Sequence, residues 1–413
     1  MTAKLPVAVG ELCEVEVPGR DPQLAEVIGF EHGIAQLLPF ESVEGLQADA
    51  TIRGLGRHIS IPCGNQLLGR VVDGLVRPID NKGPLLTHSW ESLEVDSPSP
   101  VSRQKIDRPF VTGQRVIDGL LTIGRGQRVG LFAGSGVGKS TLLGEIAKGA
   151  ESDINVIALV GERGREVRPF IEDCLGPTGL KKSVVIVSTS EQSALLRVHA
   201  AQAAVAISTF FRDQGLNVLT MIDSMTRVAT AQREIGLLLG EPPSARGYTP
   251  SVFRILSGLL EPLGANDVGT ITAITTVLVD GDDMDEPISD SIRSIVDGHF
   301  VLDRSLAEKD HFPAINVSQS ISRVFRDVTD ATQQEAARRI RQIQATHAEF
   351  EDMIRIGAYT PGGAPDVDMA ISLMKPVNAF LRQRVDEFAP LNTSKQLMSK
   401  IAAPWAQIEG AMV

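Results

Sequence analysis

The sequence has few cysteines, few aromatic residues and no long apolar run. Its three cysteines, Cys13, Cys63 and Cys174, are far apart and in no metal-binding spacing, so we expect small buried thiols in a reducing compartment. No segment approaches the roughly 18 to 20 uninterrupted apolar residues that cross a bilayer. The first residues contain no apolar stretch long enough for a signal peptide. These absences predict a cytosolic protein.

Clusters of basic residues are also missing. The 40 Lys and Arg residues face 51 Asp and Glu residues, which gives a formal net charge of −11, and no run is dense in Lys or Arg. A protein that binds nucleic acid without sequence preference usually needs a basic face. The composition therefore argues against a nucleic-acid partner.

The 413 residues divide into three regions with different sequence patterns. Residues 1–92 hold short β-type runs broken by Gly, Pro and Asp, ending with HISIP and LLGRVVDG, which is typical of a small β-barrel. Residues 93–330 begin with a Pro- and Ser-rich linker. They continue with apolar strand-like runs that alternate with helical patterns, which predicts a mostly parallel sheet covered on both faces. Residues 331–413 contain apolar residues at helical spacing and predict a helical bundle.

A glycine-rich turn lies between a strand pattern and a helix pattern at residues 129–141, which read VGLFAGSGVGKST. This is the [AG]-x4-G-K-[ST] pattern of a nucleotide phosphate loop. Glycines let backbone N–H groups converge on phosphates, and the N-terminus of the following helix favours negative charge. The lysine supplies a mobile positive charge, and the serine hydroxyl can ligate Mg²⁺. The predicted nucleotide-binding residues are Ala133, Gly134, Ser135, Gly136, Val137, Gly138, Lys139, Ser140 and Thr141.

Two acidic residues end strand-like runs downstream of this loop. Asp223 ends NVLTMID, where a carboxylate can hold the water shell of Mg²⁺ beside the phosphate loop. Glu162 ends VIALVGE, at the strand edge where such sheets place their active sites, and can activate a water for attack on the γ-phosphate. An isolated Asp in the position of Asp223 is more often a turn residue at a strand end, and the phosphate loop upstream reverses that balance. By itself Glu162 could equally be part of a solvated charge cluster.

The phosphate loop, Glu162 and Asp223 belong, in this chain order, to a longer series of motifs. The series comprises DRPFVTGQRVIDGLLTIGRGQRVGLFAGSGVGKS, GERGREV, MIDSMTRVATAQREI, GEPPSARGYTPSVF and HFPAINVSQSISRVF. It resembles the catalytic subunits of rotary ATP synthases and is more similar still to the flagellar and type III secretion export ATPases. The GEPPSARGYTPSVF block and VLVDGDDMDEPISDSIRSIVDGH favour the export branch. The resemblance covers nearly the whole chain and implies a RecA-like P-loop domain between the barrel and the helical bundle.

The resemblance also implies roles for individual residues. Lys139 would serve the phosphates and Glu162 would be the catalytic glutamate, with Arg163 as a nearby arginine of the active site. Asp223 would be the Walker B aspartate, and Glu166 an acid near the water shell of the metal. ATP and Mg²⁺ are the implied substrate and cofactor.

The same resemblance implies roles for three further residues. Arg323 would be the arginine that reaches into the site of the neighbouring subunit, and a planar guanidinium suits the charge on a transferring phosphoryl group. Phe312 would pack against adenine, and Tyr359 would form the other wall of that pocket. Without the resemblance, Arg323 could be a structural ion-pair residue and Phe312 an ordinary core residue.

The family implies partners as well. It predicts a homohexamer at the inner face of the bacterial cytoplasmic membrane, a stator-like regulatory protein, a central stalk protein, secretion chaperones with their substrates and, indirectly, a membrane-embedded export gate. Members usually carry a helical segment before the barrel that binds the regulatory partner, whereas only about ten residues precede the first expected strand here.

Other functions remain open at this point. One is the catalytic subunit of a rotary synthase, and another is a non-catalytic nucleotide-binding subunit, against which Glu162 argues. A third is an RNA-translocating ring helicase, which would need a basic, aromatic-bearing barrel face. Residues 1–91 contain only Phe30, Phe40 and Trp90 as aromatics and no Lys or Arg cluster.

Overall fold

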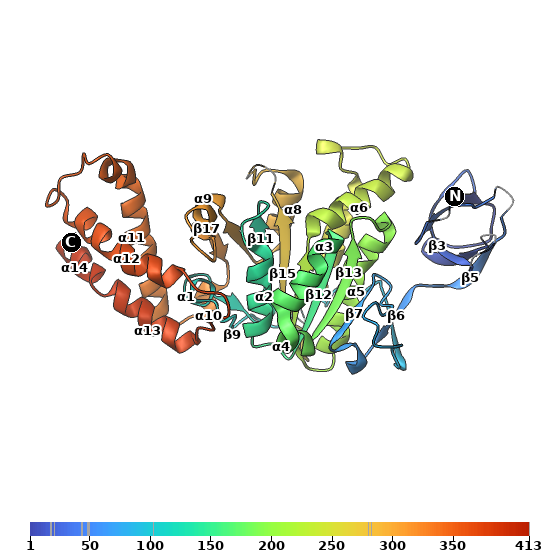
Figure 1. Ribbon diagram of the computed structural model, residues 1–413, viewed down its shortest axis with the longest axis horizontal. Coiled ribbons are helices and arrows are strands. Elements are labelled where there is room, and N and C mark those ends of the chain that lie inside the picture. The colour runs from blue at the N-terminus through green and yellow to red at the C-terminus, as the bar shows by residue number, and fades with distance from the viewer. Residues whose placement is uncertain are drawn as a thin grey trace.

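The computed structural model describes residues 1–413 except 17, 18, 20, 43, 48, 49, 102, 280, 282 and 413. Residues 280 and 282 belong to the VLVDGDDMDEP block, and that part of the motif therefore lies outside the described residues. Figure 1 shows an elongated molecule with a central sheet, the N-terminal strands at one end and the C-terminal helices at the other. The α/β fold with an N-terminal barrel and C-terminal helices is confirmed.

The N-terminal domain is a five-stranded antiparallel sheet in the order β1-β4-β3-β2-β5. Alternate residues of its strands, such as Cys13, Val15, Ala25 and Val27, are fully buried, as the period of two of a half-buried strand requires. The first strand begins at residue 2, earlier than expected. The strands are β1 (Thr2–Ala3), β2 (Glu11–Val15), β3 (Gln23–Glu31), β4 (Ile34–Pro39) and β5 (Ile52–His58).

The expected first domain, residues 1–92, divides in two. The run LLGRVVDG contains β7 (Arg70–Val72), which pairs in parallel with β13 and forms an edge of the central sheet. The run HISIP leads into β6 (Ser60–Cys63), which pairs with β8 (Ser89–Ser92). Apolar side chains of this region pack into the core of the α/β domain. The barrel therefore ends near residue 58, because the later strands find their partners in the α/β domain.

The central sheet has eight strands in the order β17-β16-β11-β15-β14-β12-β13-β7. All neighbours pair in parallel except β16 and β17. The strands not yet bounded are β11 (Arg128–Ala133), β12 (Ile154–Glu162), β13 (Ser183–Thr189), β14 (Asn217–Asp223), β15 (Thr270–Leu278), β16 (Gly298–Leu302) and β17 (Ile315–Ser322). A further pair of short strands, β9 (Pro109–Phe110) and β10 (Ile123–Gly124), lies outside this sheet.

Helices cover both faces of the sheet, which explains its continuous apolar runs. In β12, Ile157 and Leu159 pack in the cluster that contains α2, whereas Val156, Ala158 and Val160 pack in the cluster that contains α5, α6 and α7. The helices of this domain are α1 (Arg115–Leu120), α2 (Lys139–Gly149), α3 (Gly164–Pro169), α4 (Gly176–Lys181), α5 (Ala194–Arg212), α6 (Met225–Leu238), α7 (Pro250–Leu260), α8 (Pro287–Ile295), α9 (Arg304–Glu308) and α10 (Phe325–Val328), with a π-helix at Phe170–Leu175 and single 3₁₀ turns at Asn65–Leu67 and Ala245–Gly247.

Helix α5 alone, among the described residues, is long and apolar enough to cross a membrane. Most of its apolar stretch is buried inside the protein, where it packs against β12, β13 and β14. Its composition is therefore that of a core helix.

The described part of the C-terminal domain, up to residue 412, contains four helices. The side chain of Asp330 accepts a hydrogen bond from the backbone N of Gln333 and caps the first helix at its N-terminus. The predicted apolar side of that helix is buried at Ile340 and Ile343. The helices are α11 (Ala331–Arg355), α12 (Pro365–Leu381), α13 (Leu391–Ala402) and α14 (Trp405–Met412).

Candidate active site

The phosphate-loop residues form the turn between β11 and α2. Ala133 ends the strand, and Lys139 begins the helix after Gly138, whose φ of 85° lies in the left-handed region. A Cβ at Gly138 would lie 3.2 Å from the Phe312 ring, so glycine serves both the turn and the close approach of the aromatic residue. Ser140 and Thr141 are exposed in the first turn of α2. The loop thus presents a helix N-terminus suited to phosphate groups.

Strand order brings the two predicted acids to this loop. Strands β14 and β12 lie side by side, and both end at the edge of the sheet where β11 ends. The Lys139 ammonium group forms a salt bridge with Asp223 Oδ1 and lies 3.7 Å from Glu162 Oε1. The Asp223 side chain is only 3% exposed and that of Glu162 19%. One mobile cation therefore bridges the two carboxylates of the site.

A bulge at the end of β12 sets the direction of Glu162. The pairing register shifts between Val160 and Glu162, and the intervening Gly161 has a φ of 69°. A Cβ at Gly161 would lie 2.7 Å from Cβ of Arg227 on α6. Both the left-handed backbone and the close helix require glycine here, and the bulge aims the carboxylate at Lys139.

Burial raises the pKa of the Glu162 carboxyl above its usual value. The nearby negative charge of Asp223 raises that pKa further, whereas Lys139 and Arg227 lower it. Arg227 was not among the residues expected from the sequence. Its position four residues after Asp223, at the start of the helix that follows the strand, could have identified it in the sequence.

Arg163 and Glu166 lie at the rim of the site. Their side chains are 66% and 49% exposed, and Nη1 of Arg163 lies 3.8 Å from Oε1 of Glu166. Glu166 acts on the site through its charge, which contributes to the raised pKa of Glu162. Of the two acids expected near the metal, Asp223 lies at the phosphate loop and Glu166 pairs with an arginine at the opening.

A cavity of about 790 Å³ adjoins the phosphate loop. Gly136, Gly138 and Thr141 line it, together with Phe312 and Val385. Phe312 is 39% exposed, as expected of a ring available to a planar ligand. The cavity has the position and apolar lining of an adenine site.

The segment between α12 and α13 is hydrogen-bonded to other parts of the chain around this cavity. The backbone N of Gln383 donates to Phe312 O at 2.9 Å. Its side-chain Nε2 donates to Gly113 O at 2.7 Å, and its Oε1 accepts from Arg115 N at 2.8 Å. Gln383, which is largely buried, thus ties the C-terminal helices to the aromatic residue and to the segment that precedes the phosphate loop.

Tyr359 does not lie in this cavity, which corrects the sequence-based expectation. Its hydroxyl lies 3.1 Å from Ala364 O and 3.0 Å from Asp368 Oδ1, and its ring meets Phe350 edge-on. It belongs to the turn between α11 and α12, whereas Val385 follows the other end of α12. The 17 residues of that helix span about 25 Å, which separates the two positions. The cavity is lined instead by Val385, from the segment that follows α12.

We expect Phe312→Ala to weaken nucleotide binding by about 5- to 150-fold, the effect of removing one base-stacking aromatic ring. Tyr359→Ala, the matched loss of an aromatic ring outside the cavity, should change affinity less than twofold. Titration with a fluorescent ATP analogue measures both. Equal losses in the two variants would restore Tyr359 to the base pocket.

Arg323 lies far from the phosphate loop of its own chain. It follows β17, whose last residue, Ser322, pairs with Gly298 at the beginning of β16. Since β16 runs parallel to β11, Arg323 lies at the edge of the sheet opposite to the phosphate loop. Its side chain is exposed, with Nη2 donating to Arg293 O at 3.1 Å.

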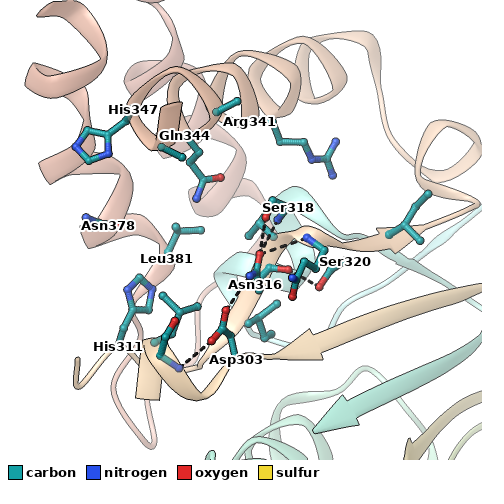
Figure 2. A pocket seen from close by; sticks show the side chains of 18 of the residues that line it. Asp303, His311, Asn316, Ser318, Ser320, Arg341, Gln344, His347, Asn378 and Leu381 are labelled. Carbon is teal, nitrogen blue, oxygen red and sulfur yellow. Dashed lines mark hydrogen bonds between the residues drawn. The ribbon is translucent and has the colours of Figure 1, made fainter. Parts of the chain in front are cut away.

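Arg323 also lines a larger cavity, of about 1110 Å³, between β17 and the helices α11 and α12. Figure 2 shows Gln344 and His347 of α11 on one side of it and Asn316 of β17 on the other, hydrogen-bonded to Asp303. This cavity contains no residue of the phosphate loop. The fold therefore gathers Lys139, Glu162, Asp223 and Phe312, and leaves Arg323 and Tyr359 elsewhere.

The sequence matches three known family models in chain order. Residues 2–56 match the β-barrel domain and residues 113–322 the nucleotide-binding domain of the ATP synthase alpha/beta family. Residues 329–400 match the C-terminal domain of the T3SS EscN ATPase.

Individual proteins are similar over nearly the whole chain. The flagellum-specific ATP synthase of Bacillus subtilis is 50% identical over 389 residues, which cover 94% of this chain and 89% of that protein. The type 3 secretion system ATPase of Xanthomonas euvesicatoria is 44% identical over 97% of this chain and 90% of that protein. The solved structure of the assembled ATPase EscN of the enteropathogenic E. coli type III secretion system matches with a TM-score of 0.93 and 45% identity, over 97% of both chains. EscN in complex with its central stalk EscO matches with a TM-score of 0.90 and 45% identity, again over 97% of both chains.

Proposed function

The chain belongs to the family of flagellum-specific and type III secretion system ATPases, and from that premise we propose that it hydrolyses ATP at the subunit interfaces of a homohexameric ring to drive protein export. The single observation that carries the chemistry is the cluster of Lys139, Asp223 and Glu162 at the phosphate loop. The relatives favour export over the rotary-synthase and RNA-helicase alternatives.

The phosphate loop binds the triphosphate. Backbone N–H groups at the start of α2 point at the phosphates, and Lys139 exchanges its contacts with Asp223 and Glu162 for contacts with the β- and γ-phosphates. The base lies in the cavity against Phe312, with Val385 in the same lining. Binding thus frees both carboxylates from the lysine at the moment the substrate arrives.

The residues present fit Mg²⁺ bound in the manner usual for phosphate-transferring enzymes. No group of three or more His, Cys, Asp and Glu side chains forms a ready-made metal cage within the described ranges. Mg²⁺ commonly keeps several waters and takes its other ligands from one or two protein oxygens and from phosphates. Ser140 and Asp223 would supply the protein oxygens, and the ion would neutralise charge on the phosphates.

Glu162 orients the attacking water and accepts its proton. The carboxylate lies at the mouth of the phosphate loop, and its raised pKa makes it a better proton acceptor than an exposed glutamate. Because this pKa is raised, we expect a larger fraction of Glu162 to be protonated, and therefore inactive, in mildly acidic solution.

Assembly completes the site. Arg323 and Glu162 lie at different edges of the sheet within one chain, so Arg323 could act on a γ-phosphate only in the site of a neighbouring chain. The similarity to assembled EscN and to its complex with a central stalk supports a homo-oligomer that contacts a stalk protein. We extend the proposal to six subunits, a stator-like regulatory protein, chaperone–substrate complexes and, indirectly, the export gate, at the inner face of the cytoplasmic membrane.

We expect the ATPase rate per chain, measured with Mg²⁺, to rise with protein concentration until rings are complete. The pure chain should need no second type of subunit, since it carries both Glu162 and Arg323. Added RNA should not raise the rate. A rate that is independent of concentration, or that appears only with a non-catalytic partner or with RNA, would contradict the proposal.

A further inference from the structure

Thr276 occupies a buried position between the phosphate-loop strand and the strand of Asp223. It lies on β15, which pairs with β11 on one side and with β14 on the other. In the parallel register Thr275 is opposite Ile222, so Thr276 is level with Asp223. Its hydroxyl donates to Asp223 Oδ1 at 2.6 Å, and the residue is fully buried.

Asp223 Oδ1 accepts from two groups of different mobility. One is the ammonium group of Lys139, on a long side chain that also approaches Glu162. The other is the Thr276 hydroxyl, on a β-branched side chain within a central strand, where χ1 is restricted. Within the part of the chain that the structure describes, the hydrogen bonds of this carboxylate fall on Oδ1 and leave Oδ2 free.

We infer that Thr276 is a positioning residue that fixes the Asp223 carboxylate for Mg²⁺. When Lys139 turns to the phosphates, Thr276 is the donor that stays on Oδ1 and keeps Oδ2 directed at the water shell of the ion. This inference rests on the proposed ATPase function and deepens it, because it names a residue that acts through the Walker B aspartate. Hydrogen bonds to an ionised acceptor are among the stronger ones in proteins, which makes the loss measurable.

The neighbouring Thr275 provides a matched control. It lies on the same strand and is equally buried, but its hydroxyl bonds to the backbone oxygen of Val129 at 3.5 Å. Thr275→Val and Thr276→Val thus make the same change in adjacent buried positions, and only the second removes a partner of Asp223. Thr276→Ser keeps the hydroxyl and tests for rescue.

The experiment measures binding of a fluorescent, non-hydrolysable ATP analogue to the full chain, first in EDTA and then over a titration of Mg²⁺. In wild type and in Thr275→Val, Mg²⁺ should tighten binding with the same midpoint. In Thr276→Val the affinity in EDTA should stay within twofold of wild type, and the Mg²⁺ midpoint should rise about tenfold. Thr276→Ser should return the midpoint to within threefold of wild type.

Three results would overturn the inference. They are an unchanged Mg²⁺ midpoint in Thr276→Val, an equal shift in Thr275→Val, and a loss of affinity in Thr276→Val that is already complete in EDTA. If wild type bound the analogue and the variants behaved in one of these ways, only the role of Thr276 would fall. If wild type showed no Mg²⁺-dependent binding, the proposed function would fall and the inference with it.

Discussion

Replacing Glu162 with Gln should lower ATP turnover by about 10²- to 10⁴-fold, the contribution of a general base, while nucleotide affinity changes little. Gln has nearly the shape of Glu and can still hydrogen-bond a water, but it cannot take the proton of that water. The carboxylate lies 3.7 Å from Lys139 and contacts the substrate region only at the phosphate end, so the base pocket is untouched. Single-turnover hydrolysis and analogue binding separate the two effects.

Glu172→Gln is the matched control. Glu172 forms an exposed salt bridge with Arg168, outside the cluster around Lys139, and its replacement should leave turnover within twofold of wild type. Near-normal turnover in Glu162→Gln would refute the assignment of the base. Loss of nucleotide binding in the same variant would indicate a structural role instead.

The pH dependence of the wild-type enzyme follows from the same residue. Burial and the charge of Asp223 raise the pKa of Glu162, and only its deprotonated form can act as a base. We therefore expect kcat/KM to decline as the pH falls through that raised pKa. This decline should occur at a higher pH than it would for a glutamate with the usual pKa of an exposed side chain. The Glu162→Gln variant should lack this acid limb.

Replacing Arg323 with Ala should lower turnover of the assembled enzyme by about 10³- to 10⁵-fold, the range known for arginine fingers. Because Arg323 lies at the sheet edge opposite to its own phosphate loop, binding of ATP by the isolated chain should be unchanged. Arg326→Ala, the same change three residues later in the lining of the same cavity, should have a much smaller effect. A comparable loss in both variants would point to a general defect in assembly.

Mixing two inactive variants tests whether the arginine acts across an interface. In rings formed from equal amounts of Arg323→Ala and Glu162→Gln, about one interface in four would combine an intact glutamate with an intact arginine, given random incorporation into a symmetric ring. Activity should therefore return toward about a quarter of the wild-type rate. A mixture as inactive as its components would contradict the interfacial role of Arg323.

Local sequence patterns were sufficient for the phosphate-loop half of the site. A strand, a glycine turn and a helix N-terminus follow one another at residues 129–141, and the chemistry of phosphate binding depends on that contiguous order. Asp223 and Glu162 could be proposed because each ends an apolar strand, and parallel strands end at a common edge of the sheet. Fold class and family follow from the same contiguous motifs.

Contacts between distant segments needed the tertiary structure. The run around Arg70 resembles a barrel strand in its composition, but it pairs with β13, more than a hundred residues later. The resemblance placed Tyr359 in the base pocket, yet a 17-residue helix separates it from the cavity that Val385 lines. Thr276 has no motif of its own, and its role depends on which strands flank β15. Periodicity and spacing indicate which residues are buried and which elements they form. Contacts between residues far apart in the chain depend on strand order and helix length, which local patterns do not encode.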